Sequence, residues 1–353
     1  SIPGFQFPSI VGPFNVFDVR VSGSQTIFDW SAIRRLQAAR VAVTAVKADA
    51  QGTRNQVADQ VARAYLAALR NEATLATAKA NLELSEALLK LANSQKRAGT
   101  GTGIEVTRAE VQLANDRQRL VVAQNERERA RLQLMRTVGL RLEGSVELTD
   151  KLDYKPSEAP SAADAVKAAL GDRPELKAQQ DRVRNADLSY GATKWERLPS
   201  VGFFGDYGSI GPGIDSAFPT RNFGVSLKVP LFDGGRRDAR RAESLSQLRQ
   251  ERIRATDLKE QIELDVRLAL ESLRSADAQV TAAREGVELA EKEVTQARRR
   301  YEAGVANSVE VTDAQTRLQR ARDNQISALF NHNLARIDLN TAMGTIQQFV
   351  SSF

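Results

Sequence analysis

Three carboxylates are the side chains whose positions first suggest chemistry. Glu105, Glu310 and Asp313 each lie shortly after a glycine-containing stretch, at the start of a predicted helix. A negative charge in the first helical turn is stabilised by the positive end of the helix dipole, which accounts for these residues without any ligand. A role in attracting ions must therefore come from the arrangement of the helices that carry them.

Enzyme chemistry is not indicated elsewhere in the chain. The sequence has no cysteine and a single histidine, His332, so thiol chemistry and a histidine-based metal site or proton relay within one chain are not expected. We predict that His332 is an ordinary helix-face residue. The stretch GTGTG at 99–103 follows a helix and lacks the Gly-Lys-Ser/Thr ending of a phosphate-binding loop. The sequence thus predicts no enzyme, no cofactor and no metal site.

The charge pattern does not indicate a nucleic-acid partner. The net charge of +6 comes from 50 basic and 44 acidic residues that are mixed along the chain. Arginines interspersed with glutamates and aspartates are typical of solvated helix faces, so we expect no nucleic acid. No run of about 18 apolar residues is present and no signal peptide is visible, so we expect no transmembrane helix and a chain that is either cytosolic or mature.

The chain contains a duplicated unit with an offset of 205 residues. The tripeptide Glu-Val-Thr at 105–107 recurs at 310–312 (310 − 105 = 205), and Gly139 matches Gly344 at the same offset. One large repeat indicates a duplicated domain and not a short-period solenoid. The counterparts of 161–196 and of one strand would lie before residue 1, so we expect that part of the first copy is missing from this sequence.

Two very long helices dominate the predicted secondary structure. Segments 30–97 and 236–303 contain no proline, and at about 1.5 Å per residue each helix would reach roughly 100 Å. Large residues alternate with alanine in heptads, which lets two helices pack closely in a left-handed pair. In the second copy these residues are Leu273, Ala276, Val280, Ala283, Val287, Ala290, Val294, Ala297 and Tyr301. In the first copy they are Ala68, Leu75, Ala78, Leu82, Leu89, Ala92 and Lys96.

Shorter elements complete each copy. Returning helices are predicted at 105–138 and 308–343, and Asn307 can cap the second of them. A further helix starts at Ser161 and restarts near Pro174.

Amphipathic strands precede the long helices. Alternating apolar residues predict strands at 14–28 and 222–232, with a third, shorter strand at 200–208 and a loop at 208–219 that makes a hairpin. Two or three strands with an apolar face cannot stand alone, but strands of about ten residues can form the wall of a membrane barrel with copies from other chains.

The residues resemble those of the TolC-like outer-membrane efflux family over almost the whole chain. VPLFDGGRR at 229–237 is similar to that family's strand-to-helix junction, and RYEAG at 300–304 with VEVTD at 309–313 is similar to its periplasmic helix turn. The resemblance implies a mainly α fold, in which very long antiparallel coiled-coil helices form a trimeric periplasmic α-barrel. It also implies amphipathic β-strands, four from each chain, in a shared outer-membrane β-barrel.

The implied function is a passive channel of a tripartite efflux or type I secretion system. The resemblance implies a homotrimer in the outer membrane of a Gram-negative bacterium, extending into the periplasm, with a periplasmic adaptor (membrane fusion) protein, an inner-membrane pump and outer-membrane lipid as partners. A periplasmic adaptor is an alternative, but it needs more strands than this chain offers. A soluble coiled-coil scaffold is another, but it would not need the apolar face of 222–232.

These expectations divide the chain into seven parts. They are the strand and loop of repeat 1 (1–29), its helical hairpin (30–140), a linker or equatorial segment (141–160), the first helices of repeat 2 (161–197), its β-hairpin (198–233), its helical hairpin (234–345) and a C-terminal tail (346–353).

The helix turns are the candidate docking site. In the family, small-residue turns at this place seat the tip of the adaptor, because glycine permits close approach of the backbone. The corresponding residues here are Arg97, Gly99, Thr100, Gly304 and Val305. The structural alternative is that both glycines simply end their helices in a left-handed conformation.

The resemblance also implies a periplasmic gate. Carboxylates at the positions of Glu310 and Asp313 face the threefold axis in the family, where a ring of charges would attract cations. Tyr301 matches a tyrosine that holds the closed end shut, with Glu105 as its candidate partner, although Tyr301 can equally be a heptad core residue. The family's gate arginine is absent, because Ala306 occupies its position.

Residues beside the strands have two interpretations each. The arginines at 236, 237, 240 and 241 could meet lipid phosphates or form a solvated helix face. Trp30 and Trp195 could belong to an interfacial belt or be buried between helices.

Overall fold

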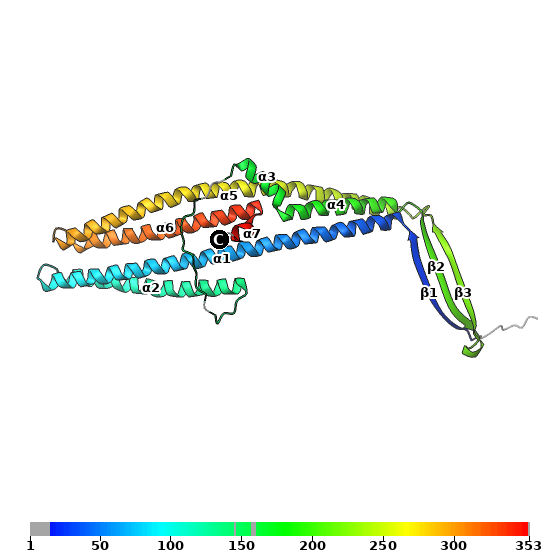
Figure 1. Cartoon of the computed structure of the whole chain (residues 1–353), viewed down its shortest axis with the longest axis horizontal. Coiled ribbons are helices and arrows are strands. Elements are labelled where there is room, and N and C mark those ends of the chain that lie inside the picture. Colours follow the sequence, from blue (N-terminus) through cyan, green and yellow to red (C-terminus); the bar gives the residue numbers. More distant parts are fainter. Residues whose placement is uncertain (1–14, 145, 157–159, 352–353) are drawn as a thin grey trace, which may run out of the picture. The chain divides into compact units, whose positions relative to one another are not determined.

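The structure is a computed structural model that describes residues 15–144, 146–156 and 160–351. Its elements are labelled in Figure 1. In chain order they are β1 (Phe17–Phe28), α1 (Trp30–Arg97), α2 (Gly103–Val138), α3 (Ala162–Asp172), α4 (Pro174–Trp195), β2 (Ser200–Gly211), the short 3₁₀ helix η1 (Ile214–Ser216), β3 (Phe218–Lys228), α5 (Arg236–Glu302), α6 (Ser308–Met343) and α7 (Ile346–Ser351). Within the described ranges, every helix is too short or too polar to cross a bilayer.

Two compact units can be distinguished by their internal contacts. Among the described residues, the strand unit comprises 15–46 and 178–255, and the helical unit comprises those of 47–177 and 256–351. The strand unit holds the sheet together with the adjoining parts of α1, α4 and α5. The helical unit holds the rest of those helices, together with α2, α3, α6 and α7.

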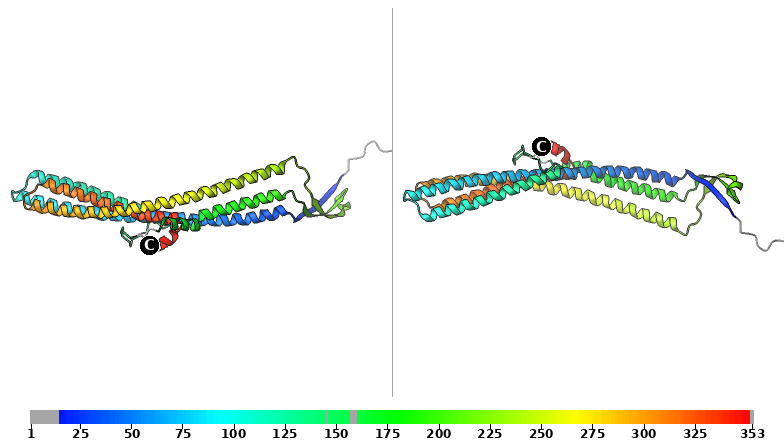
Figure 2. Two further views of the ribbon diagram at one scale, coloured as in Figure 1. Left: turned by 90° about the horizontal axis from the view of Figure 1, so that it is seen from above. Right: turned by 90° about the horizontal axis from the view of Figure 1, so that it is seen from below.

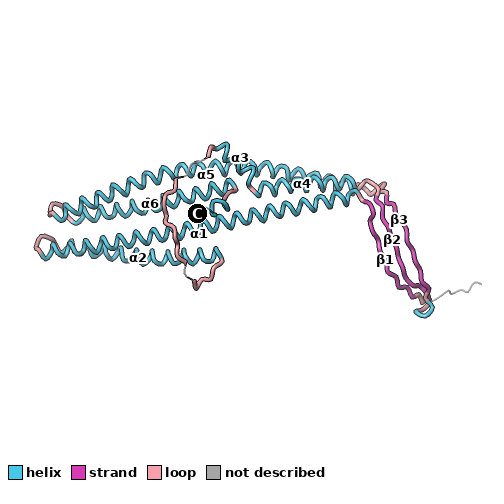
Figure 3. The backbone as a smooth tube through the Cα atoms, viewed as in Figure 1, coloured by secondary structure: helices cyan, strands magenta, loops and turns pink. Residues whose placement is uncertain are grey.

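The sheet of the strand unit is antiparallel, with the order β1-β2-β3 (Figure 3). Paired residues in an antiparallel sheet point to the same side, so the register defines two faces. The large apolar residues of one face are Val19, Val21, Phe203, Tyr207, Phe223, Val225 and Leu227, and all are exposed in the single chain. The other face carries the ion pair between Arg20 Nε and Asp18 Oδ1 at 2.9 Å, together with Phe204, Ile210 and Phe218. The predicted one-sided strands are confirmed.

The boundaries of the hairpin differ from the sequence prediction. β3 begins four residues earlier than expected and ends at Lys228, so Val229 and Leu231 lie outside the strand. The register gives a reason, because Lys228 is already paired with Ser200, the first residue of β2. Pro230 follows, and proline has no N–H to donate to the next rung.

The duplication is visible in the helical unit. α2 and α6 both contain 36 residues, and their first residues differ by 308 − 103 = 205. α1 and α5 end at Arg97 and Glu302, which differ by the same 205. Figures 1 and 2 show each long helix followed by a shorter helix that runs back beside it. The predicted repeat of two helical hairpins is therefore confirmed.

Apolar clusters hold these hairpins together. Leu273, Val266 and Ile262 of α5 are fully buried against Ala165 of α3 and Leu339 of α6. A second cluster joins α5 and α6 nearer to the turns, and a third joins α1, α6 and α7. Most of the heptad stripe of α5 is buried as predicted, whereas the stripe of α1 is only partly buried, with Lys96 exposed.

The remaining helix ends follow local rules. Ser161 caps α3 by accepting a hydrogen bond from Asp164 N at 3.2 Å, and α4 begins at Pro174, where a missing N–H has no cost. The segment 346–353, described above as a tail, contains α7, whose Ile346 is completely buried.

Candidate functional site

Both hairpin turns end their first helix in the same way. Gly99 and Gly304 have φ of 74° and 71°, in the left-handed region. Gly304 N donates to Tyr301 O at 3.1 Å and Val305 N donates to Arg300 O at 3.0 Å, the pair of bonds that defines a Schellman motif. Gly99 and Thr100 make the same bonds to Lys96 and Gln95. The predicted left-handed glycines are confirmed.

The turn surface is open in the single chain. Arg97, Thr100, Gly304 and Val305 are exposed, and a Cβ added to either turn glycine would meet no atom within 4 Å. The glycines are therefore required here by the backbone conformation and not by contacts within the chain. The docking role of these turns is a separate proposal.

The three carboxylates of the candidate gate have different partners. Glu105 is partly buried, and its Oε2 accepts a hydrogen bond from Thr102 N at 2.8 Å, so it reaches back to cap its own helix. Glu310 is exposed, and its Oε1 lies 2.9 Å from Nε of Arg300 on the other side of the turn. Asp313 lies one turn further along α6 and is exposed.

Tyr301 is a core residue of the hairpin. Only 5% of its surface is exposed, and its ring packs with Leu88 of α1 and Val311 of α6. Burial, together with the nearby charge of Glu105, raises the pKa of the Tyr301 hydroxyl. Its hydroxyl has no hydrogen-bond partner among the described residues, so a direct bond from Tyr301 to Glu105 is not formed.

A small recess with both apolar and polar lining lies beside Tyr301. Its volume is about 20 Å³, and its polar lining includes Glu105, Arg108, Gln112, Tyr301 and Ser308. Ser308 is only 9% exposed, and its hydroxyl also lacks a hydrogen-bond partner within the described ranges. Two residues with buried, unpaired hydroxyls thus line one recess.

Sequence reasoning did not identify Arg300 or Ser308. Arg300 and Glu310 are brought together by the turn, and the sequence contains no spacing rule that pairs residues across such a turn. Ser308 follows the predicted cap, Asn307, whose Oδ1 accepts hydrogen bonds from Val309 N at 3.1 Å and Glu310 N at 3.2 Å. A serine directly after the cap, on the heptad side of a helix, was the one available signal.

His332 is not a helix-face residue, and that prediction was wrong. It is completely buried, its Nε2 lies 2.9 Å from Asp277 Oδ1 of α5, and its ring centroid lies 4.8 Å from that of Tyr154. The segment that carries Tyr154 covers this side of α6, which the helical pattern of α6 alone cannot reveal. The predicted absence of a histidine-based metal site does not depend on this burial.

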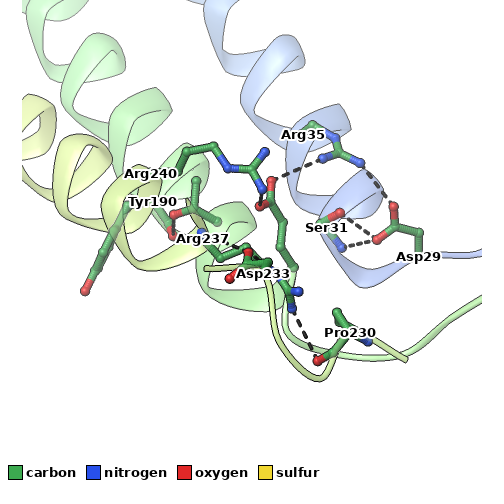
Figure 4. A network of polar contacts seen from close by, with 10 residues as sticks. Asp29, Ser31, Arg35, Tyr190, Pro230, Asp233, Arg237 and Arg240 are labelled. Atoms are coloured by element: carbon green, nitrogen blue, oxygen red, sulfur yellow. Dashed lines mark hydrogen bonds and ion pairs between the residues drawn. The ribbon is translucent and has the colours of Figure 1, made fainter. Parts of the chain in front are cut away.

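The strand-to-helix junctions are held by ion pairs (Figure 4). Asp29 Oδ1 accepts hydrogen bonds from Ser31 N at 2.8 Å and Ser31 Oγ at 2.6 Å. Burial alone would raise the pKa of Asp29, but these bonds and the charge of Arg35 outweigh it and the pKa is lowered. Asp233 Oδ2 lies 2.7 Å from Arg237 Nε, and its pKa is likewise lowered by that partner against the effect of burial. Asp29 and Asp233 lie 204 residues apart (233 − 29 = 204), and each makes its contacts at the start of a long helix.

The other junction residues also contact one another. Arg240 Nη2 lies 2.8 Å from Glu196 Oε2, so at least two of the junction arginines neutralise acidic neighbours within the chain. The rings of Trp30 and Trp195 pack edge to face with centroids 5.5 Å apart, and Trp30 remains 42% exposed. The tryptophans are therefore partly packed and partly open to their surroundings.

Known proteins resemble this chain in sequence and in fold. A family model described as "Outer membrane efflux protein" matches residues 13–140 and 165–345. The pyoverdine export outer membrane protein OpmQ of Pseudomonas putida is 25% identical over 336 residues, which cover 93% of this chain and 70% of OpmQ. The outer membrane efflux protein BepC of Brucella suis is 26% identical over 335 residues, covering 88% of this chain and 71% of BepC. The crystal structure of CusC, at 18% identity, has the same fold, with a TM-score of 0.83 over 96% of this chain and 80% of CusC.

Proposed function

Because this chain belongs to the outer membrane efflux protein family, we propose that it is a passive conduit that carries substrates across the periplasm and the outer membrane. The observation that carries this proposal is a sheet with one exposed apolar face, joined to two copies of a long helical hairpin. Such a sheet needs an apolar surrounding, and hydrocarbon lipid provides it.

The proposed assembly is a homotrimer. An open three-stranded sheet leaves edge strands with unpaired backbone groups, and a membrane tolerates them only in a closed barrel. Sheets from several chains would close it, with Val225 and its neighbours toward lipid and Arg20 with Asp18 toward the lumen. β1 and β2 have 12 residues each and β3 has 11, close to the 9–11 residues that a tilted strand needs to cross a bilayer.

The hairpin turns are the proposed contact with a periplasmic adaptor. Gly99 and Gly304 leave a low, open surface beside Arg97, Thr100 and Val305, which a helical hairpin tip could approach closely. An inner-membrane pump would supply the energy, since a passive channel performs no chemistry.

The proposed gate is the group of Tyr301, Glu105, Glu310 and Asp313. Threefold symmetry would turn each carboxylate into a ring of three charges, which favours cations. Within one chain Arg300 lies against Glu310, so the effective charge of that ring depends on whether this exposed pair is kept. Asp313 would supply the less neutralised ring.

Reconstitution tests the proposed function. Detergent-extracted protein should migrate as a heat-sensitive trimer and form cation-selective channels in planar bilayers. A protein that is soluble without detergent, remains monomeric and gives no conductance would contradict the proposal and favour a scaffold.

A further inference from the structure

The three connections between strands and helices carry most of the net charge of the chain. These connections, which we call the junction surface, are residues 29–35, 194–198 and 228–241, and all of them belong to the strand unit. They contain nine basic and four acidic residues, a net charge of +5 (9 − 4 = 5), whereas the whole chain has +6. The register of the strands places all three connections at the same end of the sheet, so the positive charge is concentrated there.

Side chains from the three connections meet in one place (Figure 4). Glu196, from the connection between α4 and β2, lies between two arginines of the other connections. Its Oε2 is 2.8 Å from Arg240 Nη2 of α5, and its Oε1 is 3.9 Å from Arg35 Nη1 of α1. The junction surface is therefore one continuous patch and not three separate ones.

The positive charge of this patch is only partly neutralised within the chain. Each of its four acidic residues pairs with one arginine: Asp29 with Arg35, Glu196 with Arg240, Asp233 with Arg237 and Asp238 with Arg197. Arg236 is exposed, and among the described residues neither Arg236 nor Arg241 takes part in an ion pair. The remaining excess of basic residues favours an anionic partner outside the chain.

Large apolar side chains lie next to these arginines. Leu231 and Phe232 are 91% and 90% exposed, although the loop that carries them is held in place by Asp233, whose Oδ2 accepts hydrogen bonds from Arg237 N at 3.0 Å and Nε at 2.7 Å. The apolar face of the sheet ends just before this loop, at Leu227, which is 66% exposed. The surface that we propose to face lipid thus continues directly into the positively charged patch.

This combination of groups identifies the chemistry of the partner. An acidic protein surface would match the charge, but it would gain little from two almost fully exposed apolar side chains. A phospholipid carries an anionic phosphate next to its acyl chains, and an arginine guanidinium matches a phosphate group with paired hydrogen bonds. Burial of Leu231 and Phe232 among acyl chains would also remove their apolar surface from water.

We propose that the junction surface binds anionic phospholipids at the surface of the bilayer, with Arg236 at the phosphate groups and Leu231 and Phe232 among the acyl chains. This inference rests on the proposed function, which places the sheet in a membrane. It adds a preference for the charge of the lipid headgroup, which an apolar barrel wall by itself does not require.

The tryptophans of the chain make this preference measurable. Trp30 and Trp195 are its two tryptophans, both belong to the junction surface, and Trp30 is 42% exposed. Detergent-purified protein is titrated with phosphatidylglycerol or phosphatidylcholine that carry the same brominated acyl chains, which quench tryptophan fluorescence on contact. The anionic lipid should reach half-maximal quenching at a lipid fraction at least about fivefold lower, the effect expected of one basic residue near an anionic surface. Equal fractions for the two lipids would overturn the proposal and favour an acidic protein surface as the partner.

Matched variants separate the proposed site from the general charge of the protein. Arg236→Gln should reduce the preference for phosphatidylglycerol about fivefold. Arg249→Gln is the control, because Arg249 is an exposed arginine of the same helix, 13 residues further on (249 − 236 = 13) and so about 20 Å away. It should keep the wild-type preference, and an equal loss in both variants would overturn the proposal.

A third variant tests the apolar part of the site. Phe232→Ser should raise the fraction needed for half-maximal quenching with both lipids, whereas Leu289→Ser, at a 65% exposed position of α5 in the helical unit, should not. Unchanged quenching in Phe232→Ser would contradict the insertion of this residue among acyl chains.

Two further measurements distinguish lipid from free phosphate and this inference from the proposed function. If inorganic phosphate abolishes the preference for phosphatidylglycerol, and chloride at the same ionic strength does not, the site takes free phosphate and the proposal is overturned. A protein that forms channels in planar bilayers but shows no headgroup preference refutes this inference alone. A protein that prefers phosphatidylglycerol but forms no channel supports the lipid site and refutes the proposed conduit.

Discussion

Acidification between pH 7 and pH 5 should destabilise the helical unit through His332. The ring is completely buried against Asp277 of α5 and Tyr154 of the preceding segment. Burial lowers the pKa of His332, the negative charge of Asp277 partly opposes that effect, and the positive charge of Arg336 adds to it. The other nearby cation, Arg284, lies over the Tyr154 ring, with its guanidinium carbon 5.8 Å from the ring centroid.

The sign follows from proton linkage. Above the ordinary histidine pKa of about 6.5, His332 is neutral in both the folded and the unfolded chain, and its full contribution to stability is present. As the pH falls below that value, the unfolded chain binds the proton first, because the folded pKa is lower. The free energy of unfolding then decreases until the pH passes the folded pKa.

The magnitude is limited by the number of protons. One histidine per chain can change the free energy of unfolding by at most about 1.4 kcal/mol per pH unit, or about 4 kcal/mol per pH unit if three chains unfold together. His332 is the single histidine of the sequence, and most carboxylates titrate below pH 5. Burial raises the pKa of Asp323, so a variant of His332 is needed to separate the two contributions.

Thermal unfolding followed by circular dichroism from pH 7.5 to pH 5 measures this effect. The control is His332→Gln, which keeps a polar side chain next to Asp277 but does not titrate. The wild-type melting temperature should fall more steeply with decreasing pH than that of the variant. Parallel curves, or a wild-type protein that gains stability on acidification, would refute the reasoning.

Three further predictions concern the gate, the turns and the core. Glu310→Gln should reduce cation selectivity and Arg300→Gln should increase it, measured as reversal potentials in a salt gradient. Reversal potentials that shift in the same direction in both variants would contradict the pairing of these side chains. Gly304→Ala should lower the unfolding free energy by about 1–2 kcal/mol because of its positive φ, whereas Gly286→Ala, inside α5 and equally free of close contacts, should raise it by about 1 kcal/mol. Leu273→Ala should lower the unfolding free energy by about 2–5 kcal/mol, measured by urea denaturation, against little change for the exposed Leu289→Ala.

Much of the fold could be predicted because long helices depend on local rules. The absence of proline between residues 30 and 97 was sufficient to place α1, and glycine marked the end of both long helices. The ends of the strands were less predictable, since β3 stops where β2 has no further residue to pair with Lys228. That limit depends on the register of a partner strand and cannot be seen in either segment alone.

The candidate site was only partly predictable, because its contacts join distant segments. The turn glycines and the acidic first turns follow from helix-capping rules. The ion pair of Arg300 with Glu310 and the burial of His332 depend on how helices and the linker pack, and no periodic pattern encodes them. Tyr301 was open to two interpretations, as a gate residue and as a heptad core residue. The structure confirms the core position, because Tyr301 is buried in an apolar cluster.

Comparison of the two copies separates structural from functional residues. Positions that keep the same role in both copies, such as Gly99 and Gly304, serve the hairpin fold itself. The pair Arg127 and Glu72, with Nε and Oε1 2.6 Å apart, has as its counterpart the pair His332 and Asp277, because both residues differ by 205.

The second hairpin thus has, in place of an arginine–glutamate ion pair, a histidine–aspartate pair in which burial lowers the pKa of His332 and favours the neutral ring. The second hairpin also carries Tyr301 and Ser308 where the first has lysine and glycine. Since both copies share one backbone plan, these differences do not arise from the needs of the fold. The contacts that differ between the copies therefore indicate a role for the second hairpin beyond folding. We expect variants of these residues in the second hairpin to alter gating, and equivalent changes in the first hairpin to alter mainly stability.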